Sequence, residues 1–175
     1  MGILDGLGDM LKQATSGNAS DGQVHAAYDQ VARTVPQGTL AGGISHVFNS
    51  DQTPPFEQML SGLFNQSNPD QKAGILNQIL GSLGPGGVSQ VLGSIGGAGA
   101  LGGLGGLLSG GSVTPAQAAQ VSPADVQVLA QHAAKQDPSI VDAAANFYAQ
   151  HSTLVKAIGA GALALVMSHI SQARR

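Results

Sequence analysis

The stretch TPPFEQMLSGLFNQSNPDQKAGILNQILGSL, residues 53–83, carries the clearest signal of the fold. Its large apolar residues recur at spacings of three and four, which places them on one face of an α-helix. They are Phe56, Met59, Leu60, Leu63 and Phe64, followed by Leu76, Ile79, Leu80 and Leu83. Thr53 is the expected cap of the first helix, with Pro54 at its first position, and Asn68–Gln71 cap the second. The stretch therefore predicts two successive amphipathic helices.

The residues before this stretch show the same helical pattern. Residues 3–15 are expected to form an amphipathic helix. A second helix is expected to begin at Ser20, which has Gln23 three residues later as in a capping box, and to end before Pro36; a third, weakened by glycine, follows it. The apolar faces of these two helices contain Val24, Ala27, Tyr28, Val31 and Val35, then Leu40, Ile44, Val47 and Phe48.

The C-terminal part of the chain contains further helix starts. Thr114–Gln117 and Ser122–Asp125 each place a capping side chain before a proline, and Asp137–Pro138 marks a third start. The expected apolar faces are Val126, Leu129, Ala130 and Ala133, then Ile140, Val141, Ala144, Phe147 and Tyr148. The final segment, residues 152–175, carries an apolar run from 157 to 167.

These patterns predict an all-α fold, a multihelical bundle in two helical sections joined by a Gly-rich apolar segment. The chain has 175 residues, of which 42% are hydrophobic, and this is enough to form a core. Because only 3% are aromatic and there is no Trp, the core side chains are small and the helices must approach closely. The expected divisions are an N-terminal helix and loop at 1–19, a helical bundle at 20–83, the Gly-rich segment at 84–112 and the C-terminal helical section at 113–175.

Composition argues against several functional classes. The formal net charge is −3 and only 10% of residues are charged, so no extended basic surface is available for nucleic acid. With no cysteine, the chain has no disulfide, thiolate metal site or cysteine nucleophile. We expect no cofactor. Asp5 and Asp9 stand where an export signal needs positive charge and an apolar run, which favours a cytoplasmic location.

No catalytic or metal-binding motif is present. The five histidines do not occur in HExxH or another close ligand spacing, and they are His25, His46, His132, His151 and His169. Ser, His and Asp are available, but there is no GxSxG elbow. The carboxylate pairs Asp5 with Asp9 and Asp137 with Asp142 are typical of solvated helix faces or helix N-termini. The sequence therefore predicts a protein that is not an enzyme, and no small-molecule substrate is evident.

The Gly-rich segment has two competing interpretations. Gly97, Gly99 and Gly102 have GxGxxG-like spacing, but nucleotide binding requires a preceding strand that the sequence does not predict. Small-residue spacing of four is the more informative pattern, because glycines along one side of a helix allow a second backbone to come close. The candidate self-association residues are Gly93, Gly97, Gly102, Gly106 and Gly110. A flexible linker is the alternative, but its leucines favour a packed or membrane-contacting segment.

The opening Met1–Asp5, Met-Gly-Ile-Leu-Asp, followed by Gly6–Gly8, together with the Gly-rich region and short capped helices, resembles the YidB-like family of bacterial proteins. The resemblance implies a multihelical bundle with no known activity. No functional residue is carried over from it.

Together these features predict a non-catalytic, self-associating helical protein, a homo-oligomer that packs through Gly- and Ala-rich surfaces. The alternative is a membrane-associated protein that inserts the Gly-rich and C-terminal apolar segments, since residues 88–108 are uncharged and about as long as a bilayer-spanning helix. An enzyme with a His and Asp site formed only in three dimensions is a third hypothesis. No positive feature of the sequence supports it.

Overall fold

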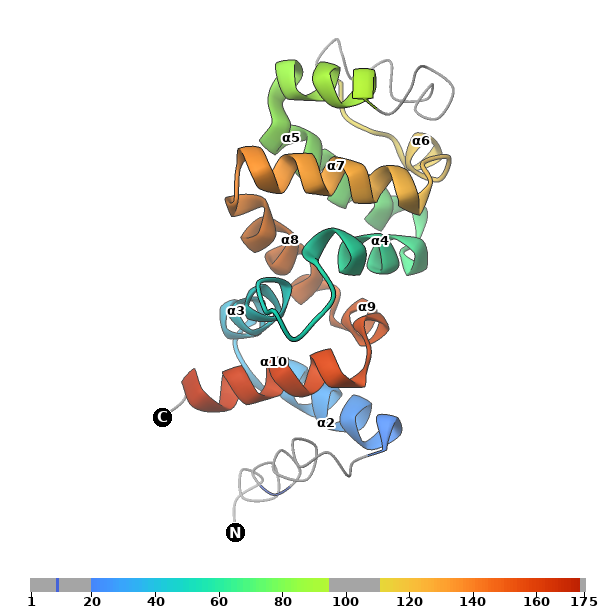
Figure 1. Ribbon diagram of the computed structural model, residues 1–175. Coiled ribbons are helices and arrows are strands. Elements are labelled where there is room, and N and C mark those ends of the chain that lie inside the picture. Colours follow the sequence, from blue (N-terminus) through green and yellow to red (C-terminus); the bar gives the residue numbers. More distant parts are fainter. Residues whose placement is uncertain (1–8, 10–19, 95–110, 174–175) are drawn as a thin grey trace. The chain divides into compact units, whose positions relative to one another are not determined.

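The structure, a computed structural model, describes residues 9, 20–94 and 111–173, and in these ranges it contains helices and no strand (Figure 1). The all-α prediction is therefore confirmed. The expected helix at 3–15 lies outside the described residues, apart from Asp9. The helices are α2 (Asp21–Thr34), α3 (Gln37–Phe48), α4 (Phe56–Gln66), α5 (Pro69–Ser94), α6 (Pro115–Ala118), α7 (Pro123–Gln136), α8 (Ser139–Gln150), α9 (Ser152–Val155), the 3-10 helix η2 (Lys156–Ile158) and α10 (Ala160–Ala173).

The chain divides into two compact units. Unit 1 consists of residues 1–53 and 145–175, and unit 2 consists of residues 54–144. This division cuts across the sections expected from the sequence, because 20–83 contributes α2 and α3 to unit 1 and α4 and α5 to unit 2. Periodicity identifies the buried face of a helix but not the helix against which that face packs.

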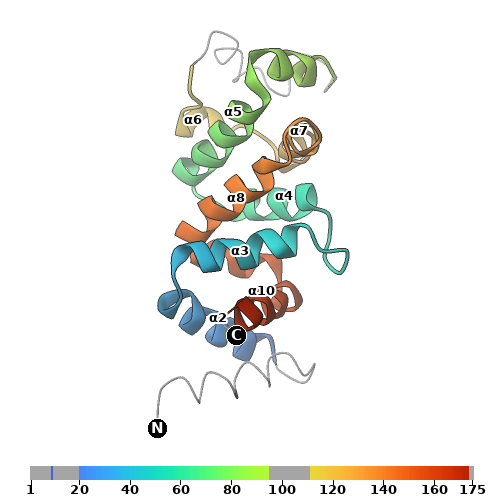
Figure 2. The ribbon, with the colours of Figure 1, turned by 90° about the vertical axis from the view of Figure 1, so that its left-hand side faces the viewer.

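In unit 1, α10 packs against both α3 and α2 (Figure 2). The closest approach is at Gly43 of α3, where a Cβ would lie 3.0 Å from Val166 Cγ1 and 3.2 Å from the Val166 carbonyl oxygen. Lys156 Nζ donates to Asp29 Oδ2 at 2.5 Å and so joins η2 to α2. Close packing through small residues is what the low aromatic content of the chain predicts.

In unit 2, α7 packs against α4 and α5, and α5 also packs against α6. The apolar faces predicted for α4 and for the first part of α5 are buried, as are those of α7. Ser61 of α4 donates a hydrogen bond from Oγ to the Pro123 carbonyl at 2.7 Å, and this bond fixes the start of α7 against α4.

Most predicted helix caps are confirmed. Gln23 Oε1 accepts from the Ser20 backbone N–H at 3.1 Å at the start of α2. Asn68 and Gln71 exchange two hydrogen bonds of 2.9 and 3.0 Å at the start of α5. Ser122 Oγ accepts from the Asp125 N–H at 3.2 Å at the start of α7. Such caps are local interactions, which is why sequence alone identifies them.

The predicted cap at Thr53 is wrong, because α4 begins only at Phe56, after Pro55. A residue that precedes proline is pushed toward extended conformations, so two successive prolines delay the start of the helix. Thr53 instead closes the preceding loop, since its Oγ1 donates to the Val47 carbonyl at 2.6 Å. Phe147 also differs from the expected buried pattern of α8, because it is half-exposed with its ring centroid 4.7 Å from that of His151.

The core of unit 1 contains a polar atom without a partner. Tyr28 is 0% exposed, and its hydroxyl has no hydrogen-bond partner in the described part of the chain. Burial raises the pKa of the Tyr28 hydroxyl well above its ordinary value, and the charge of Asp29 raises it further. Leaving a buried hydroxyl unpaired costs about 1–3 kcal/mol, so the contribution of this tyrosine to stability comes from its ring.

We expect Tyr28→Phe to raise the free energy of unfolding by about 1 kcal/mol at pH 7, because it removes the unpaired hydroxyl and keeps the ring. The gain should grow above pH about 10. Above that pH the Tyr28 hydroxyl ionises in the unfolded state, whereas its raised pKa keeps it protonated in the folded state. Alkali therefore lowers the free energy of unfolding of the unmodified protein, and this effect is absent in the variant. Urea unfolding at pH 7 and 10.5 measures both effects. Destabilisation by Tyr28→Phe at neutral pH would show that the hydroxyl has a partner.

Candidate binding cavity at the bend of helix α5

Helix α5 bends sharply at Gly84. This residue has φ +64° and ψ 174°, a conformation open essentially only to glycine, and Pro85 follows it. Proline removes a backbone donor and disfavours the helical conformation of the residue before it. Residues 69–83 and 85–94 are therefore two helical segments that meet at an angle. The sequence marks this point, since the Gly-rich segment was expected to begin at Gly84.

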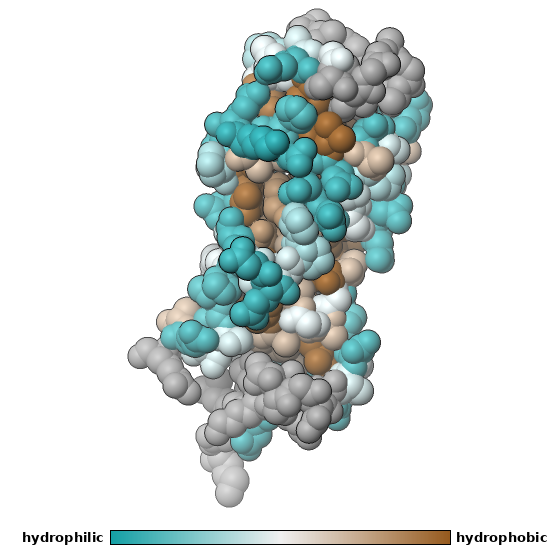
Figure 3. Space-filling model, in the orientation of Figure 1, coloured by the Kyte–Doolittle hydropathy of each residue, from teal (hydrophilic) through white to brown (hydrophobic). Residues whose placement is uncertain are grey.

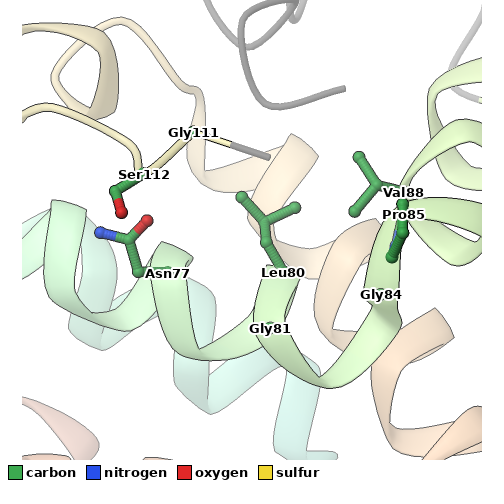
Figure 4. Close-up of a pocket in the computed structure, with 8 residues that line it drawn as sticks. All are labelled: Asn77, Leu80, Gly81, Gly84, Pro85, Val88, Gly111 and Ser112. Carbon is green, nitrogen blue, oxygen red and sulfur yellow. The ribbon is translucent and has the colours of Figure 1, made fainter. Parts of the chain in front are cut away.

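The bend forms one wall of a half-open cavity of about 330 Å³. Asn77 and Ser112 lie at one end of the cavity, Pro85 and Val88 at the other, and Leu80 between them (Figure 4). The described residues that line it are Asn77, Leu80, Gly81, Gly84, Pro85, Val88, Gly111 and Ser112. The two walls thus come from α5 and from the chain just before α6.

Asn77 holds these two walls together. Its Oδ1 accepts from the Val113 backbone N–H at 2.7 Å, and its Nδ2 donates to the Val113 carbonyl at 3.3 Å. Val113 is itself buried, and Thr114 then starts α6 with its capping box to Gln117. A side-chain amide that pairs with both polar groups of one backbone residue fixes that residue firmly, so the wall at 111–112 is anchored on α5.

The far segment of α5 is held against α7. A Cβ at Gly87 would lie 2.9 Å from Gln136 Oε1 and 3.1 Å from Leu83 Cβ, so the chain packs closely around this glycine. Ser89 Oγ donates to the Pro85 carbonyl at 3.0 Å, one turn earlier. The close packing of Gly87 against Leu83 and Gln136 thus joins the second segment of α5 to its first segment and to α7, whereas the Ser89 hydrogen bond lies within the second segment.

The lining suits uncharged, apolar groups. Leu80, Pro85 and Val88 supply apolar surface, and none of the described lining residues carries a charge. At the polar end, the Ser112 hydroxyl forms no hydrogen bond within the described residues and is open to a ligand. Hydrophilic residues cover most of the face seen in Figure 3, with smaller hydrophobic areas between them. The cavity therefore suits an aliphatic group, and its described lining residues include no acid, base or nucleophile pair.

Of the predicted self-association residues, only Gly93 lies in the described part of the chain. It is exposed near the end of α5, and a Cβ there would have no heavy atom within 4 Å. Gly97, Gly102, Gly106 and Gly110 lie outside the described residues. The cavity itself was not predicted. Gly84 and Pro85 were a visible signal for the bend, but nothing local pairs Asn77 with Val113, 36 residues away.

The histidines do not form a metal site in the part of the chain that the structure describes, where no three metal-ligating side chains converge. His132 Nδ1 lies 3.0 Å from the Val128 carbonyl and His151 Nδ1 lies 3.0 Å from the Phe147 carbonyl, each one turn earlier on its own helix. His25 is half-exposed on α2. Among the carboxylates, Asp137 Oδ1 accepts from the Ser139 N–H at 3.0 Å at the start of α8.

Two histidines from distant parts of the sequence meet in unit 1. The rings of His46 on α3 and His169 on α10 stack with centroids 4.5 Å apart and planes 20° apart. Each lies one turn beyond the close approach of Gly43 and Val166, so that approach brings the rings together. Sequence spacing does not predict this pair, because the two histidines belong to separate helices.

In comparisons with protein-family models, curated proteins and solved structures, the chain matches none of them. The resemblance to the YidB-like family stays an expectation. In the described ranges, no helix combines the length and the apolar character that crossing a bilayer requires.

Proposed function

We propose that this chain is a non-catalytic helical protein that self-associates through its glycine-rich surfaces. One observation carries the proposal: several helical glycines are exposed, and a Cβ at each would meet no heavy atom within 4 Å. Among them are Gly38 and Gly42 on α3 and Gly81, Gly86 and Gly93 on α5. Packing within the chain favours glycine at Gly43, where a Cβ would meet the backbone of α10, but gives no reason for glycine at these positions.

Each of these glycines lowers the stability of its helix, and contacts within the chain do not compensate for that loss. Glycine in a helix is less favourable than alanine by about 1 kcal/mol, because it loses more backbone freedom on folding. A second backbone that approaches the bare helix surface offsets this cost through close packing. Gly38 and Gly42 have the spacing of four that aligns glycines on one side of a helix, and Gly86 and Gly93 are two turns apart.

A second copy of the chain is the partner that fits best. No Asp, Glu, Lys or Arg occurs between Lys72 and Asp125, so this part of the surface attracts neither nucleic acid nor a highly charged protein. A symmetric homo-oligomer places the same patch of each copy at the interface, and an uncharged patch brings no like charges together there. We propose that it is a bacterial protein, as its resemblance to the YidB-like family implies, and that it acts in the cytoplasm. Membrane association through the Gly-rich and C-terminal apolar segments is the alternative.

The mass of the purified full-length protein in solution tests this proposal. We expect light scattering and sedimentation to give a multiple of 17.4 kDa that dissociates on dilution and does not require detergent. The variant Gly102→Leu/Gly106→Leu should weaken the assembly, because two large side chains prevent close backbone contact. The matched control Gly22→Leu/Gly62→Leu adds the same side chains at isolated exposed helical glycines and should leave the assembly intact.

Three results would contradict the proposal. A monomer at every concentration would exclude self-association. A protein that aggregates unless detergent is present would favour the membrane alternative. Unchanged mass and melting temperature in the Gly102→Leu/Gly106→Leu variant would favour the flexible linker, since an exposed spacer tolerates added side chains.

A further inference from the structure

We infer that the stacked pair of His46 and His169 makes the contact between α3 and α10 sensitive to protons. The contact is held while the two rings carry at most one positive charge between them, and it weakens when both rings are charged. This pH response goes beyond the proposed self-association and does not depend on it, because both histidines lie in unit 1 of a single chain.

The close packing of the two helices holds the two rings near each other. Their centroids are 4.5 Å apart and their planes are 20° apart. Three residues earlier on each helix, a Cβ at Gly43 would lie 3.0 Å from Val166 Cγ1 and 3.2 Å from the Val166 carbonyl oxygen. The backbones that carry the histidines therefore cannot draw apart without breaking this close approach. Two charged rings can separate only if the helices open or if the rings turn apart and lose their stacking, and either response weakens the contact.

No described neighbour of the pair compensates for a second positive charge. The two histidines are the only titratable residues on α3 and α10, and no ion pair joins either ring to a carboxylate in the described part of the chain. Asp29 of α2 is already paired with Lys156 of η2. The other charged or titratable groups on the elements packed against α10, and on the loop after α3, are Asp21, His25, Tyr28, Arg33 and Asp51, while Arg174 and Arg175 lie outside the described residues.

The folded chain should therefore lose stability as the pH falls through the range in which histidine becomes charged, about pH 8 to 5. His46 is exposed and His169 is half-exposed, so protons from solvent reach both rings. The last turn of α3 favours a charge on His46, because the helix carbonyls there carry partial negative charge. A second charge on His169 then lies close to the first and is repelled. The unfolded chain binds both protons without this repulsion, so it binds more protons than the folded chain and is favoured by acid.

Urea unfolding at about pH 7.5 and about pH 5, with the chain diluted until it is monomeric, tests the inference. Acidification should raise the equilibrium constant for unfolding about fivefold more in the unmodified chain than in His169→Gln, because the repulsion between two unit charges 4.5 Å apart in water corresponds to about that factor. His46→Gln should show the same reduced response. His25→Gln is the matched control: it removes a half-exposed histidine of α2, outside the pair, and should respond to acid like the unmodified chain.

NMR titration of the two histidine rings provides a measurement that needs only the unmodified chain. Charging one ring should shift the signals of the other, so each titration curve should extend over a wider pH range than the curve of a single site. Circular dichroism checks that each variant is folded. If the unmodified chain and folded His169→Gln respond equally to acid, the inference is wrong. Two single-site titration curves that do not influence each other would also overturn it, whatever the variants do.

Discussion

Gly43→Leu is expected to lower the free energy of unfolding by about 2–3 kcal/mol, the largest change among the variants considered. A Cβ at this position already lies 3.0 Å from Val166 Cγ1, 3.2 Å from Ile170 Cγ1 and 3.2 Å from the Val166 carbonyl oxygen. The further atoms of leucine have no space between α3 and α10, so the two helices must separate. Overpacking of this kind typically costs about 1–3 kcal/mol, and here part of the obstacle is backbone, which cannot change rotamer.

The matched control is the adjacent glycine. Gly42 is exposed on the same helix and has open space at its Cβ, so at concentrations where the protein is monomeric Gly42→Leu should be neutral or slightly stabilising through helix propensity. Urea unfolding followed by circular dichroism compares the two variants. NMR of the His46 and His169 rings provides a local measurement, because their stacking depends on the same helix contact. Equal stability of the two variants would contradict the packing of α10 on α3 described above.

Gly42 and Gly43 also illustrate what sequence does and does not predict. The boundaries and buried faces of the helices follow from caps and spacing, which are local, so α2, α4 and α7 were identified with few errors. Neighbouring glycines look alike in sequence. Only the position of α10 shows that one of them is required for packing and the other is not.

The candidate cavity was less predictable than the helices. The sequence indicated a change of character at Gly84, and this is where α5 bends. It did not indicate that Asn77 would anchor Val113 or that Gln136 would lie against Gly87, because these contacts join residues from different helices and loops. A prediction of the bend is therefore possible from local conformation, whereas a prediction of the cavity requires the tertiary arrangement of unit 2.

Gly84→Ala is expected to lower the free energy of unfolding by about 1–3 kcal/mol. The space around Gly84 is open, so the loss comes from backbone conformation alone: φ +64° with ψ 174° is strained for any residue that has a Cβ. Gly86→Ala, two residues away and also open at its Cβ, should be neutral or stabilising, because alanine favours the helix. Thermal unfolding of both variants measures the difference.

The outcome of Gly84→Ala also bears on the cavity. If α5 keeps its bend, the strain lowers stability while Val88 stays across from Leu80. If the strain is relieved by straightening α5, Val88 moves away from Leu80 and the cavity is lost. Methyl NMR of Leu80 and Val88 in the folded variant separates these two responses. A melting temperature equal to that of Gly86→Ala would contradict the positive φ at Gly84, and with it the bend that forms the cavity wall.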